Sequence, residues 1–212
     1  EEKWLIIEDD RGETPVRLRP RRQAGSISVI IPFRDEPAMT IRCLEAVLAQ
    51  ELTARREIVL VDNQSTPENI ATVDAFLAAR GAPPVRRIVY DLPFNHSRQC
   101  ALGIDASDGE VIVLLNNDVT LTDPGTIQEL ADWALVEGIG TVGCRLVEPG
   151  GRLLSAGIKA RRYYNVRSGF PVLESTDGRH ARAVRRVFGN TFACAAMARH
   201  AYERTGPLDA RD

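Results

Sequence analysis

Four short aliphatic runs, each followed by a segment with helical periodicity, constrain the fold of this chain more than any other feature. After the first run, SISVIIPF at 26–33, the residues Ile41, Leu44, Val47 and Leu48 fall on one helical face. Strands without a polar face must be covered on both sides, and connecting helices cover them when the strands run parallel. The sequence therefore predicts an α/β fold, Rossmann-like, with a mostly parallel sheet between helices. The remaining runs are 57–62, 86–90 and 110–115, and the helices expected after them are 67–80, 97–106 and 124–136, the last with Asp123 as N-cap.

The second half of the chain follows a different pattern. Beyond Gly138, short strand candidates at 140–148 and 151–158 flank a Pro-Gly-Gly turn, which predicts a β-rich second half. The arginine-rich stretch 159–186 lacks periodicity and is predicted to be a surface loop.

The first residues have the composition of a linker. Residues 11–25 contain Pro15, Pro20 and five arginines, so 1–25 are interpreted as a linker or the edge of a preceding module, and 26–212 as one domain. Because the chain starts without methionine, we expect it to be a piece of a longer protein.

The charge balance argues for a small or neutral ligand. Lys and Arg number 27 against 29 Asp and Glu, a formal charge of -2, which would not draw the protein to nucleic acid or an anionic membrane. No apolar run approaches the roughly 20 residues of a membrane span. The four cysteines form no C-x-x-C pair, so they are interpreted as reduced core residues of a cytoplasmic protein, with attachment to the inner face of a membrane through other parts of a longer chain left open. They are Cys43, Cys100, Cys144 and Cys194.

Polar residues follow all four strand candidates, where open parallel sheets bind their ligands. Asp118 follows six mainly aliphatic residues and two amides, and oxygen ligands at the mouth of a buried strand suit a hard divalent cation. The same three residues are also good turn formers. For Asp62, in LVDNQS, a ligand contact and a helix-capping turn are equally good interpretations.

Two further groups are weaker candidates. Arg98, with Ser97 beside it at a helix start, could form an anion site, although a solvated arginine is the commoner case. Asp35 and Glu36 could bind a base or ribose, or could simply start the helix at Pro37.

Several chemistries lack their sequence motifs. The chain has no G-x-G-x-x-G after a strand, no G-x-x-x-x-G-K-[ST] and no G-x-S-x-G. His96, His180 and His200 are too scattered for a zinc site, and a lone histidine is more often structural.

The motifs taken in order resemble a known family. The segments SVIIPFRDEP, EIVLVDNQST, FNHSRQCALGIDASDGEVIVLLNNDV, GGRLLSAGI and FACAAMARHAYERTGPLDARD are similar to the family-2 inverting glycosyltransferases of GT-A fold. The chain is most similar to the bacterial branch that builds O-antigen, rhamnan and related surface polysaccharides. The resemblance covers Ser26 to Asp212 and implies a nucleotide-binding part at 26–123 and an acceptor-side part at 124–212.

This resemblance implies a UDP- or dTDP-linked sugar donor and a saccharide or lipid-linked acceptor. Pro32 and Asp35 match the P-x-Y-N motif beside the nucleoside, with Arg34 in the tyrosine position, and Asp62 matches the aspartate that recognises the base. NND matches D-x-D, so that Asp118 is the expected ligand of Mg²⁺ or Mn²⁺. The residues assigned to the nucleotide sugar are Pro32, Arg34, Asp35, Glu36, Asp62, Arg98, Asn116 and Asn117.

The chain also departs from the family pattern. Asn116 replaces the first aspartate of D-x-D, and Ala101 replaces an asparagine near the donor. The family's base lies in an [EN]-D motif that follows a G-G-F-D-E segment, here GPLDARD, so the base is expected beyond Asp212, with Asp209 as a weaker candidate.

Three functions are therefore weighed. The first is an inverting hexosyl- or rhamnosyltransferase domain whose acceptor side includes 188–197 and the arginine-rich stretch. The second is a nucleotide-sugar-binding module without catalysis. The third, a sugar-1-phosphate nucleotidyltransferase, would require a glycine-rich loop after the first strand, and PFRDEPAM contains no glycine.

Overall fold

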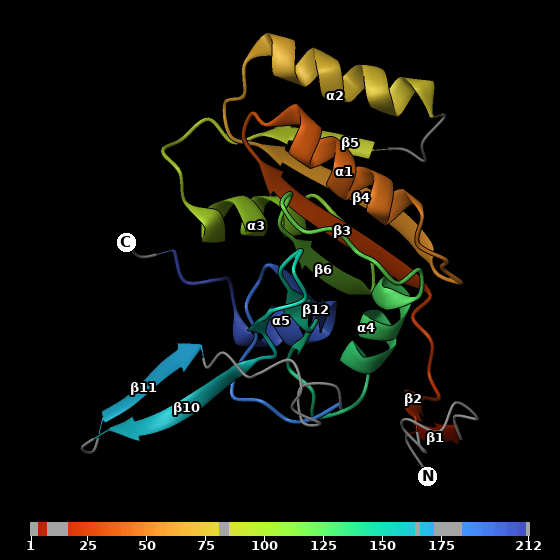
Figure 1. Cartoon of the computed structure of the whole chain (residues 1–212), viewed down its shortest axis with the longest axis vertical. Coiled ribbons are helices and arrows are strands. Elements are labelled where there is room, and N and C mark those ends of the chain that lie inside the picture. The colour runs from red at the N-terminus through yellow and green to blue at the C-terminus, as the bar shows by residue number, and fades with distance from the viewer. Residues whose placement is uncertain (1–3, 8–16, 81–84, 164–165, 172–183, 211–212) are drawn as a thin grey trace.

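A six-stranded sheet forms the centre of the molecule (Figure 1). The computed structural model describes residues 4–7, 17–80, 85–163, 166–171 and 184–210. The strand order is β5-β4-β3-β6-β12-β7, and the four neighbours β5, β4, β3 and β6 are parallel. These four are the predicted strands, which confirms the α/β fold. Their bounds are β3 Ser26–Phe33, β4 Arg55–Asp62, β5 Val85–Val89 and β6 Val111–Leu115.

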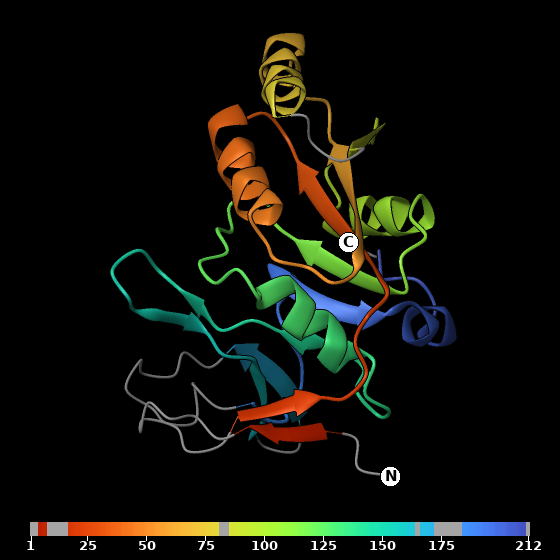
Figure 2. The ribbon, with the colours of Figure 1, turned by 90° about the vertical axis from the view of Figure 1, so that its right-hand side faces the viewer.

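Helices cover both faces of this sheet, as predicted (Figure 2). On one face α1 and α4 bury Leu44, Val47, Ile127 and Ala131 against alternate residues of the strands. On the other face α3 packs against β3, β4 and β6. Gly103 of α3 permits this close approach, because a Cβ there would lie 2.3 Å from Ile30 Cγ2. The helices are α1 Pro37–Leu48, α2 Pro67–Ala79, α3 His96–Asp105, α4 Thr126–Ala134 and α5 Arg199–Thr205.

The structure corrects the start of one predicted helix and the conformation of one predicted loop. Helix α4 begins at Thr126 after Gly125 as N-cap, two residues later than expected, because Asp123 Oδ1 accepts a hydrogen bond from the Gly125 amide in the preceding turn. In the stretch 159–186, expected to be a loop, β10 (Ile158–Tyr163) and β11 (Val166–Pro171) pair as an antiparallel hairpin that projects from the main sheet (Figure 1). Residues 172–183 of that stretch lie outside the described residues.

The β-rich second half is confirmed, but it also adds strands to the central sheet. Strand β12 (Cys194–Ala198) pairs antiparallel with β6, from Cys194 opposite Leu115 to Ala198 opposite Val111. Its residues alanine, alanine, methionine and alanine have no strong strand propensity, and burial between β6 and β7 (Val142–Gly143) decides their conformation. The predicted pair around the Pro-Gly-Gly turn is β8 (Leu146–Val147) with β9 (Leu153–Ser155).

The described part of the first 25 residues, 4–7 and 17–25, contains two strands. The strands β1 (Trp4–Ile7) and β2 (Arg17–Pro20) form an antiparallel pair, and β2 contacts α4. A strand thus lies inside the stretch with linker composition, while the division into 1–25 and 26–212 stays a prediction.

The structure also describes the four cysteines and the lengths of the helices, which concern the expected reduced core thiols and the expected lack of a membrane span. Cys43, Cys100 and Cys194 are buried and Cys144 is half-buried, and all four are free. The Sγ atoms of Cys144 and Cys194 lie 3.1 Å apart. Among the residues described, no helix has both the length and the apolarity to cross a bilayer.

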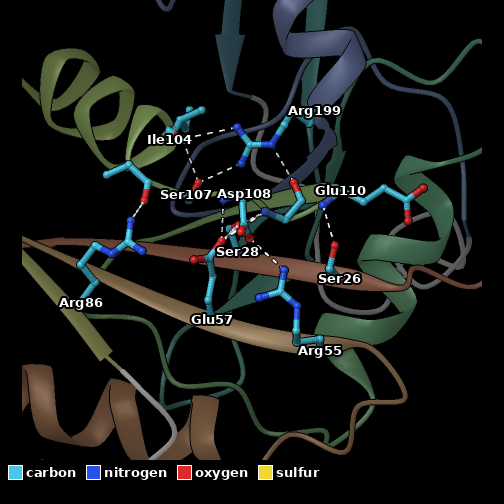
Figure 3. Close-up of polar contacts among 12 residues, drawn as sticks. Ser26, Ser28, Arg55, Glu57, Arg86, Ile104, Ser107, Asp108, Glu110 and Arg199 are labelled. Carbon is cyan, nitrogen blue, oxygen red and sulfur yellow. Dashed lines mark hydrogen bonds and ion pairs between the residues drawn. The ribbon is translucent and has the colours of Figure 1, made fainter.

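A polar cluster holds the turn between α3 and β6 at the amino edge of the sheet (Figure 3). The side chains of Ser28 and Glu57 are hydrogen-bonded to each other, and both accept from the Gly109 amide, at 2.8 and 3.1 Å. Glu57 Oε1 also accepts from the Asp108 amide at 2.7 Å. The hydroxyl of Ser26 accepts from the Glu110 amide at 2.9 Å. Side chains of β3 and β4 thus fix three successive amides, immediately before β6 begins.

Arg199, the first residue of α5, closes this cluster from the other side (Figure 3). Its guanidinium donates to the carbonyls of Gly109 at 2.7 Å and Ile104 at 3.3 Å and to the hydroxyl of Ser107 at 2.9 Å. Its backbone amide donates to the Glu110 carbonyl at 2.9 Å. The end of α3, the turn and the beginning of β6 are therefore connected to β12 and α5.

Gly109→Ala is expected to destabilise the protein by about 1–3 kcal/mol, the usual range for overpacking. A Cβ at this position would lie 2.4 Å from Ser28 Oγ and 2.6 Å from the Ser28 backbone nitrogen, so a strand would have to shift. Urea unfolding followed by circular dichroism measures the loss. Gly140→Ala is the matched control, because nothing lies within 4 Å of a Cβ there. Equal midpoints for the two variants would contradict the packing role of Gly109.

Candidate functional site

Residues that follow β3, β4 and β6 meet at the carboxyl edge of the sheet. Because the three strands are adjacent and parallel, their ends lie at one edge, and Phe33 is paired directly with Asp62. Pro32 is buried within β3, where it pairs with Val61. The structure therefore brings together the predicted residues 34–36, Asp62 and 116–118.

The turn after β3 has an unusual backbone. Asp35 and Glu36 both have left-handed φ values, 51° and 47°. Non-glycine residues in this region are uncommon and occur mostly at functional sites and tight turns. The Glu36 carbonyl accepts the amides of Met39 and Thr40, so Glu36 also starts α1. Arg34 is exposed, and its Nε lies 3.9 Å from an Asp35 oxygen.

The Asp35 carboxylate joins the end of β3 to the start of α2. Its Oδ1 accepts from the Thr66 amide at 2.8 Å and from Asn69 Nδ2 at 3.0 Å, while the Asp35 amide is hydrogen-bonded to the Ser65 hydroxyl. These bonds, the Asn69 side chain first and the Thr66 amide second, lower the pKa of Asp35 below its usual 3.8. Asp35 is therefore a charged acceptor at neutral pH, fixed in position by a neighbouring helix.

Asp62 and Asn63 are both 1% exposed at the end of β4. Asp62 Oδ1 accepts from the Ser65 amide at 2.9 Å, and its Oδ2 lies 4.0 Å from Arg87 Nη1. Asn63 Nδ2 donates to the carbonyls of Tyr90 and Leu92 at 3.1 and 3.0 Å. Asn63 was not predicted as a site residue, because in sequence it is one of several polar turn residues. Its burial assigns it the role of joining the ends of β4 and β5.

Asn116, Asn117 and Asp118 follow β6 and differ in their surroundings. Asn117 Nδ2 donates to Thr40 Oγ1 of α1 at 3.1 Å. Two hydrogen bonds hold the Asn116 backbone. Its amide donates to the Ala193 carbonyl at 2.9 Å, and its carbonyl accepts from the Val119 amide at 3.2 Å. Asp118 is exposed. Burial first, and the charge of Asp118 second, raise the pKa of the Cys43 thiol, in the middle of α1, to about 12.

The start of α3 contributes two residues that the sequence did not indicate. Asn95 is the N-cap of α3: its Oδ1 accepts from the Arg98 amide at 2.9 Å. Its Nδ2 donates to the Ala210 carbonyl at 3.1 Å, so the segment that contains Asp209 lies beside this helix start. His96 Nε2 lies 3.2 Å from Asn116 Oδ1. Only the tertiary structure reveals these contacts, because the partners are 20 and 115 residues away in the chain.

Arg98 points to a different surface from the other predicted residues. Its exposed side chain lines an open groove of about 440 Å³ between the end of β5 and α3. The same groove is lined by Val89, Tyr90, Leu92 and Ala101. Ala101 is the position at which the family pattern has an asparagine. A role of Arg98 toward an anion stays a prediction.

The residues after β6 fit a divalent cation only in part. Within the described ranges, no three Asp, Glu, His or Cys side chains are grouped as a metal site. Asp118 is the one carboxylate of the N-N-D motif, and carboxylate and amide oxygens are ligands that Mg²⁺ and Mn²⁺ accept. The donor set therefore fits a cation that takes most of its ligands from a bound diphosphate and from water, as Mg²⁺ at phosphate sites does.

Comparisons with known proteins identify the family and the fold of this chain. The family described as Glycosyl transferase family 2 matches residues 28–205. The O-antigen biosynthesis protein RfbC of Myxococcus xanthus is 29% identical over 208 residues, which are 93% of this chain and 16% of that protein. Protein y4gI of Sinorhizobium fredii, described as uncharacterized, is 31% identical over 142 residues, 66% of this chain and 15% of that protein. The chain thus spans about a sixth of the length of these relatives.

One solved structure resembles almost the whole chain. The mannosyltransferase PcManGT of Pyrobaculum calidifontis, in complex with GDP-Man and Mn²⁺, covers 99% of this chain with a TM-score of 0.63. The identity is 15%, and the match spans 52% of that protein, so the likeness concerns the fold, which is GT-A.

Replacement of Asn69 by alanine is expected to raise the pKa of Asp35 toward its usual 3.8, because the hydrogen bond that lowers this pKa most is lost. Since the folded-state pKa is the lower one, the stabilisation from this carboxylate is present above the unfolded-state pKa and is lost as the pH falls through the folded-state pKa. NMR titration of the Asp35 carboxyl ¹³C resonance between about pH 2 and 6 measures the titration midpoint in the wild type and in Asn69→Ala. Thr72→Ala, one turn further along α2, is the control. An unchanged Asp35 midpoint in Asn69→Ala would contradict this assignment.

Proposed function

This chain belongs to glycosyltransferase family 2, and on that premise we propose that it transfers a sugar from a nucleoside-diphosphate sugar to a saccharide or lipid-linked acceptor with inversion. The observation that carries the proposal is the convergence of Asp35, Asp62 and the N-N-D motif at one edge of the sheet. Ligands of open α/β sheets bind outside the carboxyl ends of the strands, at such an edge.

The nucleoside side of the site is formed by β3, β4 and the start of α2. Asp35 is half-buried and is fixed by two hydrogen bonds, so it can accept a hydrogen bond from a base or ribose without large rearrangement. Asp62 is 1% exposed, so its surroundings would have to open for a base to reach its carboxylate. UDP and dTDP are the nucleotides we propose from the resemblance. GDP is included because PcManGT binds GDP-Man in a similar fold.

On the phosphate side, Asp118 would hold Mg²⁺ or Mn²⁺, with the N-N-D backbone fixed by β12 and α1. When bound, such a cation stabilises the charge that develops on a leaving diphosphate. Asn117, tied to Thr40, and Asn116, tied to His96, keep the turn in place and so fix Asp118 relative to the strand end. The single carboxylate predicts modest affinity for the cation in the absence of nucleotide.

An inverting transfer also needs a base for the acceptor hydroxyl. The segment 206–210 approaches the site through the contact of Asn95 with the Ala210 carbonyl, which supports an acceptor side near this segment. Asp209 lies in it and is exposed. We propose that the base follows this segment in the longer protein and that Asp209 is the alternative.

The wider biological role is part of the same proposal. RfbC, the relative from Myxococcus xanthus, is named for O-antigen biosynthesis. We infer that this chain is one domain of a longer protein that builds surface polysaccharide on the cytoplasmic side of a membrane. Its acceptor would contact 124–212, including the residues around β12.

A second function is favoured by one specific observation. Ala101 and Asn116 replace polar or charged groups of the family pattern, so the domain could bind a nucleotide sugar without transferring it. A radioactive sugar-transfer or donor-hydrolysis assay with the longer protein separates the two, since a pure binding module releases no nucleotide.

Asp118→Asn is expected to weaken the binding of UDP, dTDP or GDP in the presence of Mn²⁺ by about tenfold or more, which corresponds to about 1.4 kcal/mol. The substitution keeps the size of the side chain but removes the charge that would attract the cation. Isothermal titration calorimetry with and without Mn²⁺ measures the effect, and the metal dependence should be smaller in the variant.

The matched control is Glu203→Gln, which also removes one exposed carboxylate. Glu203 lies in α5, which starts at the amino edge, opposite the candidate site. A nucleotide affinity that changes neither when Mn²⁺ is removed nor in Asp118→Asn would refute the metal-ligand role of Asp118.

A further inference from the structure

His96 connects the start of α3 to the N-N-D motif, although it belongs to none of the residues assigned above to a ligand. Its Nε2 lies 3.2 Å from Asn116 Oδ1. The ring also contacts the Cys100 thiol one helical turn later, with Sγ at 3.7 Å from Nδ1 and 3.8 Å from Nε2. The imidazole is thus placed between a buried thiol and the first residue of the motif.

The chemistry of these neighbours determines which ring nitrogen carries the proton. Burial raises the pKa of Cys100 to about 12, so the thiol keeps its proton and can donate it in a hydrogen bond. Nε2 faces Asn116 Oδ1, so the arrangement in which the thiol donates to Nδ1 gives each of the two contacts one donor and one acceptor. A neutral imidazole with Nδ1 as acceptor carries its proton on Nε2 and donates to Asn116 Oδ1.

Because this contact uses the side-chain oxygen of Asn116, the side-chain amide is left with its N–H donors for other partners. Its oxygen is engaged by His96, and its backbone amide and carbonyl are engaged by Ala193 and Val119. The remaining capacity of the side chain lies mainly in its two N–H groups. Such donors suit phosphate or hydroxyl oxygens, whereas a cation requires an oxygen ligand.

The position of His96 is also rigid enough to impose this orientation. It is the first residue of α3, after Asn95 as N-cap, and the helix packs tightly on the sheet through Gly103 against Ile30 and Val61. At the far end of the helix, Arg199 holds the Ile104 carbonyl. The backbone of His96 is therefore held in place beside Asn116, and the ring is oriented by its contacts with Asn116 and Cys100.

We propose that His96 is a positioning residue that holds the Asn116 amide through its oxygen, so that Asn116 presents N–H groups to the diphosphate or sugar hydroxyls of the donor while Asp118 alone binds the cation. This inference rests on the proposed function. It assigns different roles to the first and third residues of the N-N-D motif, and it explains how an asparagine can occupy the first position.

A double-mutant cycle on nucleotide binding tests the proposal. The probes are UDP and GDP, each titrated calorimetrically in the presence of Mn²⁺. His96→Phe keeps a planar ring without a donor and should weaken binding about three- to tenfold, a typical effect of one hydrogen bond. His96→Gln retains an N–H donor and should restore most of the affinity. In an Asn116→Ala background, His96→Phe should have no further effect, because its partner is already absent.

An equal loss from His96→Phe in both backgrounds would overturn the proposal, since His96 would then act independently of Asn116. So would wild-type affinity in His96→Phe. A purely structural role would lower the thermal midpoint of both His96 variants alike and would not be rescued by glutamine, so the melting curves of all variants are recorded in parallel.

A second measurement needs no nucleotide. The ¹⁵N resonances of the histidine rings report the tautomer, and the His96 signals are identified by their loss in His96→Gln. The proposal predicts a proton on Nε2, with a shifted resonance in Asn116→Ala, and an Nδ1-protonated ring would overturn it. Absence of nucleotide binding by the wild type would instead contradict the proposed function, together with the donor role of Asn116.

Discussion

The hydrogen bonds from the Asp108, Gly109 and Glu110 amides to the side chains of β3 and β4 are the constraint on which the rest of the structure depends. They fix where β6 begins. A strand advances about 3.3 Å per residue and alternates its faces, so a shift of one residue would move the N-N-D motif and turn its side chains to the wrong face. The amino edge of the sheet therefore determines the geometry of the site at the carboxyl edge, and a glycine is required at 109 because the Ser28 backbone is so close.

Helix α3 transmits this constraint from one edge of the sheet to the other. Its last turn is held by Arg199 at the amino edge. At the carboxyl edge its N-cap, Asn95, contacts the 206–210 segment, and its first residue, His96, contacts Asn116. Ten residues of helix span about 15 Å, enough to reach from one edge to the other. A single helix thus connects the candidate site to the segment 206–210, which contains Asp209.

The sequence predicted the fold well because its strongest signal is a physical requirement. Strands without a polar face can be buried only between two layers of helices, and β3, β4 and β6 are buried in this way. The expectation was wrong for β5, which lies at the edge of the sheet and is largely exposed, with Val89 57% exposed. Strand β12 was missed, since its alanines become a strand only by pairing with β6. The loop predicted for the arginine-rich stretch was wrong where β10 and β11 pair, because charged residues form strands when a partner strand is available.

For the candidate site, the sequence by itself determined which residues follow each strand, and therefore that Asp35, Asp62 and Asn116 to Asp118 lie at one edge. Parallel pairing makes that conclusion independent of the details of packing. Only the tertiary structure decided what each side chain touches. In the folded chain the buried Asn63 side chain joins the ends of β4 and β5 by its hydrogen bond to the Tyr90 carbonyl. The packing of α3 against the sheet places His96 beside Asn116. Contacts between residues distant in the chain depend on how helices and strands pack, which a local sequence pattern does not specify.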